Sequence, residues 1–237
     1  MTTTATSKGR PLGTRPPGTP ISTELTGTIK VMCIGDSITV GFGLIAGDSY
    51  RCLLGARAAA YGLTLDFIGA RTNGACSDNQ HNGVGGWTIE NQNTDVATRF
   101  GVLPDVIIIH LGSNNFIAGN DGLTAMGTFL ATLWGLSPGS RVIVCVPHGH
   151  HTTGVDAYAR TFEAGIAAVC AASSYGGAGL IAVCAQAAKI THQVTAAGVA
   201  ANGELVDVVH PREAAFAKIA DAIWPVFLNA TGRAADW

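Results

Sequence analysis

The chain has 237 residues, of which 47% are apolar and 13% are charged, and its formal net charge is -2. This composition excludes a disordered chain, and the slight negative charge excludes the basic field with which proteins hold nucleic acid. No apolar stretch reaches the length that spans a bilayer, so we expect no membrane segment.

The N-terminal part differs in composition from the rest. Residues 1–29 are rich in Thr, Pro and Gly and predict a flexible tail, and residues 30–237 predict a single domain. The tail lacks the continuous apolar segment of a secretory signal. This indicates a cytoplasmic protein by default, with secretion as the alternative if a leader has been removed.

Short apolar or β-branched runs alternate with helical stretches along the domain. The expected strands are residues 30–34, 64–69, 105–111, 141–146 and 180–184, and the expected helices are residues 50–61, 88–100, 123–136, 155–172 and 211–229. Pro211 is expected in the first turn of the last helix, and Pro225 is expected to kink it. The alternation predicts an α/β protein with a doubly wound, mostly parallel sheet of about five strands, whose sites form at the carboxyl ends of the strands.

Six cysteines are present. Cys33, Cys145, Cys170 and Cys184 lie in apolar runs, and we expect them to be buried thiols. Cys76 lies in a polar loop and is the best candidate for a disulfide, with Cys52 as the candidate partner, although connectivity does not follow from sequence alone.

Two distant motifs together supply the parts of an acyl-transfer enzyme. Ser37, in the motif GDS after the first strand, is a candidate nucleophile, and His210, far downstream, is a candidate base. Asp207 lies three residues before His210, and a tight turn would let its carboxylate orient the imidazole. In isolation, Asp36 or Ser37 could simply cap a helix, and His210 could be a turn residue before Pro211.

Between these motifs lie two candidate donors for an oxyanion. Gly86, in GGWT, offers a backbone N–H without an obstructing Cβ, and Asn114, in GSNN, offers a neutral side-chain amide. Each could also be an ordinary loop residue. Trp87 is expected either to shape the acyl pocket or to anchor the core, and we include the three neighbours of these motifs as candidate substrate contacts: Asp36, Trp87 and Asn115.

A histidine cluster in PHGHHTTG comprises His148, His150 and His151. A metal site is one interpretation, but no cysteine or carboxylate neighbours converge there. A polar loop at the rim of the cleft is favoured. We therefore expect no metal and no cofactor.

The segments GDSIT, GGWT, GSNN and DVVHP resemble blocks one, two, three and five of the GDSL-type esterases, also called SGNH hydrolases. The resemblance runs from Gly35 to Pro211. It implies a three-layer α/β/α sandwich of flavodoxin-like type and hydrolysis of esters through an acyl-enzyme. It also implies a catalytic triad of Ser37, Asp207 and His210, with an oxyanion hole made by the N–H groups of Ser37 and Gly86 and by the Asn114 amide.

A finer resemblance concerns LDFIGARTNG and HNGVGGWTI, residues 65–74 and 81–89, which are similar to carbohydrate esterase family three. Members of that family remove acetyl groups from xylan. The resemblance implies a small ester or an acetylated carbohydrate as substrate. The alternatives are a lipid esterase or lysophospholipase, a thioesterase, a polysaccharide deacetylase and, from another class, a non-catalytic glycan-binding module.

The chain departs from the family pattern at two positions. Asn115 stands where the third block usually ends in Asp, and Val208 stands where the fifth block usually carries Gly. We expect the first departure to alter hydrogen bonding in the loop, with Asn114 retained. The second leaves Asp207 and His210 in register.

Overall fold

The computed structural model describes residues 24–42, 49–148, 153–177, 181–184, 194–195, 198–199, 204–207 and 209–233. Its centre is a seven-stranded sheet of order β3-β4-β1-β5-β6-β7, with β2 also paired to β1. The strands are β1 (Thr28–Gly35), β2 (Thr64–Ile68), β3 (Arg71–Thr72), β4 (Gln80–Gly83), β5 (Val106–His110), β6 (Arg141–Cys145) and β7 (Ile181–Cys184). All pairings within it are parallel except that of β3 with β4.

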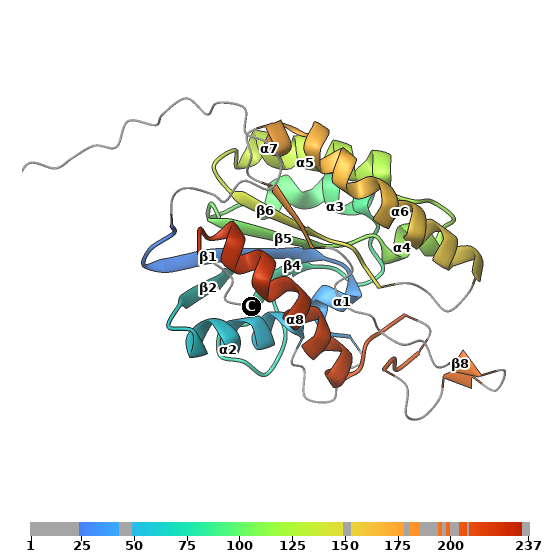
Figure 1. Cartoon of the computed structure of the whole chain (residues 1–237), viewed down its shortest axis with the longest axis horizontal. Helices are drawn as coiled ribbons and strands as arrows, with labels where there is room; N and C mark the ends of the chain where they lie inside the picture. The colour runs from blue at the N-terminus through green and yellow to red at the C-terminus, as the bar shows by residue number, and fades with distance from the viewer. Residues whose placement is uncertain are drawn as a thin grey trace, which may run out of the picture.

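Helices cover both faces of the sheet (Figure 1). On one face lie α2 (Tyr50–Ala60) and α8 (Glu213–Ala230). The other face carries α3 (Ile89–Asp95), the 3-10 turn η1 (Val96–Arg99), α4 (Ser113–Ile117), α5 (Leu123–Leu136), α6 (Thr153–Ala172) and α7 (Ser174–Gly177). A one-turn helix, α1 (Ser37–Val40), follows β1, and a two-stranded ribbon comprises β8 (Val194–Thr195) and β9 (Gly198–Val199). The expected three-layer α/β/α sandwich is confirmed.

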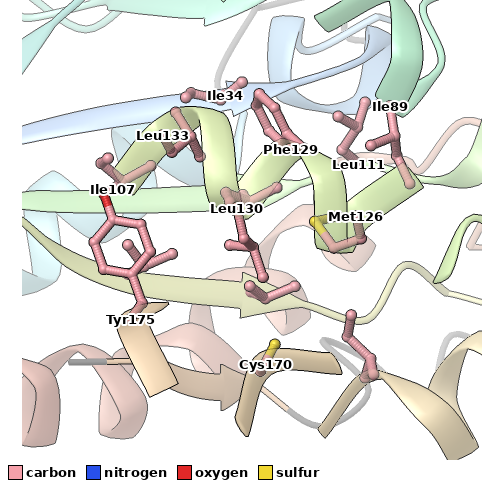
Figure 2. Packing of buried hydrophobic residues seen from close by; sticks show 14 of the residues in the cluster. Ile34, Ile89, Ile107, Leu111, Met126, Phe129, Leu130, Leu133, Cys170 and Tyr175 are labelled. Atoms are coloured by element: carbon pink, nitrogen blue, oxygen red, sulfur yellow. The ribbon is translucent and has the colours of Figure 1, made fainter. Parts of the chain in front are cut away.

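Each central strand contributes to both hydrophobic cores, because successive side chains point to opposite faces. In β5, Val106 and Ile108 pack with α2 and α8, whereas Ile107 and Ile109 pack under α3 and α5. Figure 2 shows Met126, Phe129, Leu130 and Leu133 of α5 lying on that second face. Burial on both faces explains why the run at residues 106–109 is apolar throughout.

The expected elements are present, with differences at their ends. Helix α5 has the expected bounds, and the five expected strands are the parallel strands β2, β1, β5, β6 and β7. The predicted start of the last helix is wrong: α8 begins at Glu213 after the N-cap Arg212, because Pro211 lies outside it in an isolated bridge with Leu205. Pro225 lies inside α8, which continues to Ala230.

The predicted tail is too long at its C-terminal end. Residues 24–29 belong to the fold, since the Leu25 N–H donates to the Thr231 carbonyl at 3.0 Å and Ile29 is buried in β1. The remainder of that tail, residues 1–23, lies outside the described residues.

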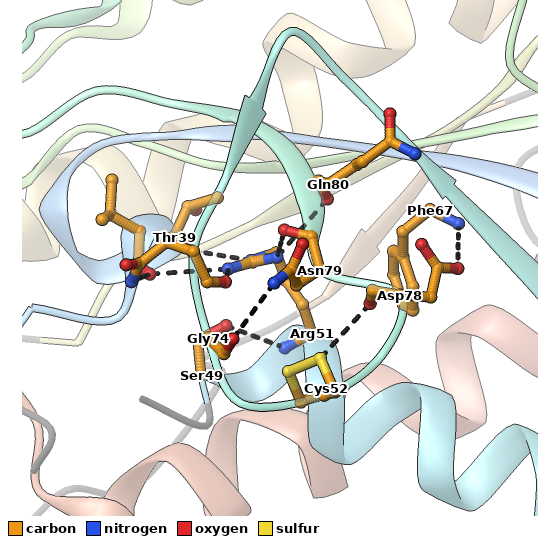
Figure 3. The surroundings of a disulfide bond; sticks show 12 residues. Thr39, Ser49, Arg51, Cys52, Phe67, Gly74, Asp78, Asn79 and Gln80 are labelled. Carbon is orange, nitrogen blue, oxygen red and sulfur yellow. Dashed lines mark hydrogen bonds between the residues drawn. A yellow bond between two sulfur atoms is a disulfide. The ribbon is translucent and has the colours of Figure 1, made fainter. Parts of the chain in front are cut away.

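The expected disulfide is present between Cys52 in α2 and Cys76 in the loop between β3 and β4, with Cα atoms 5.6 Å apart (Figure 3). Cys33, Cys145 and Cys170 are buried, as expected. Burial raises the pKa of the Cys33 and Cys170 thiols to about 12, so both are protonated at neutral pH. The side chain of Cys184 lies outside the described set.

Candidate active site

Ser37 is the first residue of α1, directly beyond the carboxyl end of β1. Asp36 is the N-cap of this helix, and its Oδ1 accepts a hydrogen bond from the Ile38 N–H at 3.0 Å. The N–H of a first helical residue has no acceptor within the helix, so that of Ser37 is suited to an oxyanion. The interpretation of Asp36 as a cap and that of Ser37 as a candidate nucleophile are therefore compatible.

His210 lies between Ser37 and Asp207. Its Nε2 is 2.8 Å from the Ser37 Oγ, and its Nδ1 is 2.7 Å from the Asp207 Oδ2. The other carboxylate oxygen of Asp207 accepts from the backbone N–H groups of Val209 and His210, at 2.9 and 2.8 Å. These bonds close the tight turn that the spacing of three residues predicts, and residues 173 positions apart in the chain meet at bonding distance.

The carboxylates of Asp36 and Asp207 are in different electrostatic states. Partial burial alone would raise the pKa of Asp207, but hydrogen bonds from the His210 ring and from two backbone N–H groups outweigh it and hold the pKa below its ordinary value. Asp36 is completely buried, which raises its pKa to about 7 against the lowering effect of the Ile38 N–H. Asp207 is therefore the carboxylate that keeps its negative charge beside His210.

The GGWT segment lies against Ser37. A Cβ built on Gly85 would be only 3.8 Å from the Ser37 Cβ. The Trp87 N–H donates to the Val84 carbonyl at 3.3 Å, which closes a turn with Gly86 in its third position at φ 77°. Glycine supplies this left-handed conformation without strain, as in a type II turn. Gly86 is exposed and open to an approaching substrate.

Asn114, the second residue of α4, reaches the same turn. Its Nδ2 donates to the Trp87 carbonyl at 3.0 Å. An amide nitrogen carries two hydrogens, so this bond orients the group and leaves one hydrogen for an oxyanion. Trp87 is half-buried, and the Arg99 guanidinium lies 5.0 Å from the centre of its ring, which is a cation–π distance.

Two of the expected substrate contacts are buried and already hydrogen-bonded. Asp36 is fully inaccessible, and Asn115 is 2% exposed. The Asn115 Oδ1 accepts from the Ile89 N–H at 2.9 Å, and its Nδ2 donates to the Glu90 carboxylate at 2.8 Å. The geometry gives both side chains supporting roles, Asp36 in capping α1 and Asn115 in tying α4 to the start of α3.

Arg51 is a supporting residue that the sequence reasoning missed. It is fully buried, and its guanidinium donates to five backbone carbonyls (Figure 3). Two belong to α1, Thr39 at 2.8 Å and Val40 at 3.4 Å. Two belong to the loop that carries Cys76, at Asn73 and Asn79, and the fifth belongs to Gln80 at the start of β4. The signal was its place on the apolar stripe of α2, three residues before Leu54 and seven before Ala58.

A second missed group lies behind the carboxyl end of β1. The Gln92 Nε2 donates to the carbonyls of Gly35 and Asn82, at 2.5 and 3.0 Å. Arg99 donates to the Gln92 Oε1 at 2.9 Å and to the Asn82 carbonyl at 3.1 Å. These bonds hold the strand ends that precede Ser37 and the GGWT turn. Polar residues inside the helix expected at residues 88–100 gave no clear signal of this.

The histidine cluster has one described member. His148 is buried, and its Nε2 donates to the Val209 carbonyl at 2.7 Å, so it contacts the turn that presents His210. His150 and His151 lie outside the described residues. Among the described side chains, no group of three or more His, Cys, Asp or Glu residues is arranged to hold a metal ion. Within the same ranges, no helix has the length and apolar character of a membrane span.

Solved structures and one family model match this chain. A search of curated sequences finds no significant match. Among solved structures, similar ones include a family 3 carbohydrate esterase from Clostridium thermocellum, with 21% identity and a TM-score of 0.68, and one from Talaromyces cellulolyticus, with 23% and 0.67. An acetyl esterase mutant with acetate ion also matches, with 23% identity and a TM-score of 0.68. Each similarity covers 86% of this chain and 98% of the other, and establishes a shared fold.

The sequence itself matches a family model. The matched region, residues 33–218, begins in β1 and ends in α8, so it contains every residue of the Ser37–His210–Asp207 arrangement. It covers most of the sequence, and the chain therefore belongs to the GDSL-like lipase/acylhydrolase family, whose members hydrolyse carboxylic esters.

Proposed function

We propose that the chain is a serine esterase that removes short acyl groups, above all acetyl, through a covalent acyl-enzyme, with acetylated carbohydrates as its substrate class. The observation that carries the proposal is the continuous hydrogen-bonded chain from the Ser37 hydroxyl through the His210 ring to the Asp207 carboxylate. A non-catalytic glycan-binding module has no need of such an arrangement.

In the first half-reaction, the Ser37 Oγ attacks the ester carbonyl carbon while His210 Nε2 takes its proton. The Asp207 carboxylate accepts a hydrogen bond from the Nδ1–H and stabilises the imidazolium that forms. The N–H groups of Ser37 and Gly86 and the Asn114 amide stabilise the tetrahedral oxyanion. His210 then gives its proton to the leaving alcohol oxygen, and the C–O bond breaks.

In the second half-reaction, water attacks the acyl-enzyme. His210 takes a proton from the water and returns one to the Ser37 Oγ, which releases the carboxylic acid.

The choice of acetylated carbohydrates depends on two supports. One is the likeness of residues 65–74 and 81–89 to carbohydrate esterase family three, and the other is the fold shared with two solved family 3 carbohydrate esterases. The Cys52–Cys76 disulfide bears on the cellular compartment in which the protein works. Disulfides persist in oxidising compartments, so this pair favours the exported alternative over the cytoplasmic one.

A hydrolysis panel tests the proposal. It compares acetate and octanoate esters of 4-nitrophenol, acetylated xylan, a lysophospholipid and an acyl thioester, with Ser37→Ala as the control. We expect release of acetate from the first and third substrates by the wild type and none by Ser37→Ala. Preference for octanoate or for the lysophospholipid would contradict acetylated carbohydrates as the substrate class and indicate a lipid esterase. Preference for the thioester would indicate a thioesterase. A Ser37→Ala variant with full activity would remove the mechanism.

A further inference from the structure

The short helix that carries Ser37 ends in a turn that directs Phe42 back toward it. Gly41 is left-handed at φ 95°, its N–H donates to the Ile38 carbonyl at 3.1 Å, and the Phe42 N–H donates to the Ser37 carbonyl at 3.0 Å. This is the hydrogen-bond pattern of a Schellman motif. In that motif the residue after the glycine packs against the residue that begins the last helical turn. Because α1 has a single turn, that residue is Ser37.

Ser37 offers no apolar side chain to complete this contact, and the Phe42 ring instead lies against His210. The two ring centres are 4.4 Å apart, with the planes inclined by 50°. Phe42 nevertheless remains 57% exposed. A large apolar surface is thus left open to solvent beside the hydrogen-bonded Ser37–His210 pair, where a substrate must enter.

The chemistry decides which part of a substrate meets this ring. In the tetrahedral intermediate the oxyanion faces Gly86 and Asn114, whereas the oxygen of the leaving alcohol must come within bonding reach of the His210 Nε2, which protonates it. The group attached to that oxygen therefore lies on the His210 side. The Phe42 ring lies against the His210 ring and is therefore on the alcohol side of the site.

We propose that Phe42 is a specificity-determining residue that contacts the leaving alcohol and favours alcohols with a ring-shaped apolar face. The C–H face of a pyranose and a cyclohexyl ring both fit this description. Covering the exposed aromatic surface removes apolar area from water, which a small alcohol such as methanol cannot do. The inference rests on the proposed esterase function and assigns the alcohol side of that same site.

The test varies one side of the ester at a time. Methyl acetate, cyclohexyl acetate and a mono-acetylated methyl xyloside share the acyl group, whereas methyl acetate and methyl butanoate share the alcohol. We expect Phe42→Ala to lower kcat/KM about tenfold on the two ring acetates and about twofold or less on methyl acetate. The ratio between methyl acetate and methyl butanoate should not change, and Phe42→Trp should retain the ring preference.

A matched control is Leu103→Ala. Leu103 is 63% exposed and precedes β5, at the amino ends of the strands. The substitution therefore removes exposed apolar surface far from the site. It should alter none of the ratios. If Phe42→Ala lowers kcat/KM equally on all three acetates, the ring acts only by supporting His210 and the inference is overturned. A change in the acetate-to-butanoate ratio would place Phe42 on the acyl side and would also overturn it.

A binding measurement separates this inference from the proposed function. Calorimetric titration of the acetylated xyloside into Ser37→Ala and into Ser37→Ala/Phe42→Ala requires no turnover. If the wild type hydrolyses no ester but the second variant binds about tenfold more weakly than the first, the proposed esterase fails while Phe42 remains a sugar contact. Equal affinities, or binding by neither, would overturn the role of Phe42 regardless of activity.

Discussion

The side-chain amide of Asn115 donates to the carboxylate of Glu90, 2.8 Å away, while its carbonyl oxygen accepts the Ile89 N–H. An aspartate at position 115 could keep the second bond but not the first. The departure from the family pattern at this position is therefore matched by a carboxylate on α3, and the expectation of altered loop hydrogen bonding has a structural explanation.

Because Asn115 and Glu90 are paired, the loss of stability caused by a substitution at one should be restored by a substitution at the other. Asn115→Asp should lower the free energy of unfolding by about 1–2 kcal/mol, because it removes a donor and places a second negative charge, on a buried side chain, beside the exposed Glu90 carboxylate. Adding Glu90→Gln should restore most of the loss, since the glutamine can donate to the new carboxylate. Urea unfolding at neutral pH measures both variants. If the double variant is no more stable than Asn115→Asp alone, repulsion from Glu90 is not the cause.

Asn114→Ala should reduce kcat by about 10²–10³ with little change in KM, because it removes a donor that acts on charge developing in the transition state. Initial rates on 4-nitrophenyl acetate give both constants. The thermal midpoint of the variant, compared with that of the wild type, controls for unfolding. Full activity on this ester would remove Asn114 from the oxyanion hole.

His148 should act through the position of His210. Its hydrogen bond to the Val209 carbonyl fixes the turn that carries His210. His148→Ala should therefore lower kcat about tenfold by displacing the His210 imidazole relative to the Ser37 hydroxyl. His148→Gln retains an N–H donor and should recover part of the rate. A purely structural contribution would lower the thermal midpoint in both variants without this difference in kcat.

His110, at the end of β5, should limit stability in acid. It is fully buried, and burial lowers its pKa to about 4, well below the value of about 6.5 of an exposed histidine. Below pH 6.5 the unfolded chain binds a proton at this residue that the folded chain does not, so stability falls as the pH drops from 6.5 to 4. The loss attributable to this group is on the order of 3 kcal/mol.

The matched variant is His110→Phe, which removes the titrating ring. Thermal midpoints at intervals between pH 7 and pH 4 should decline less steeply than those of the wild type. His81 contributes a slope of the same sign, since burial lowers its pKa to about 3, whereas Asp36 opposes both because its pKa is raised. Parallel curves for wild type and variant would show that His110 does not carry the effect.

Loss of the disulfide should affect stability more than catalysis. Cys52 and Cys76 are 24 positions apart. Removing a cross-link that closes a loop of this size lowers the free energy of unfolding by about 3 kcal/mol, because the unfolded chain gains conformational entropy. The Arg51 bonds to α1 do not depend on the disulfide. Cys52→Ser/Cys76→Ser should therefore unfold at lower urea but keep the wild-type kcat at 25 °C. A large fall in kcat of the folded variant would show that the covalent link positions Ser37.

The sequence was sufficient for the elements whose pattern is strong. The apolar run of β5 and the periodicity of α5 were recognisable because burial on two faces, or on one stripe, leaves little choice of residue. The hairpin of β3 and β4 was missed because its strands are short and polar, RT and QHNG. The place of β4 in the sheet depends on its pairing with β1, which is distant in sequence and which no local propensity indicates.

The candidate site divides in the same way. Ser37, Asp207 and His210 could be predicted to meet because acyl-transfer chemistry would require a serine, a histidine and a carboxylate together, and the structure places them at hydrogen-bonding distance. Arg51, Gln92 and His148 were not, since their task is to hold backbone carbonyls, and a carbonyl carries no residue identity. Which donor reaches it is decided by the folded path of the chain.

The place of β1 in the sheet has a consequence for biosynthesis. It is the first strand among the described residues, yet it lies between β2 and β5, and its Val31 pairs with Val106. A ribosome must add a further 75 residues after Val31 before Val106 is available and β1 can pair with β5. His210 follows Ser37 by 173 positions. A nascent polypeptide would therefore expose Ser37 without its hydrogen-bond partner until all of those positions have been translated.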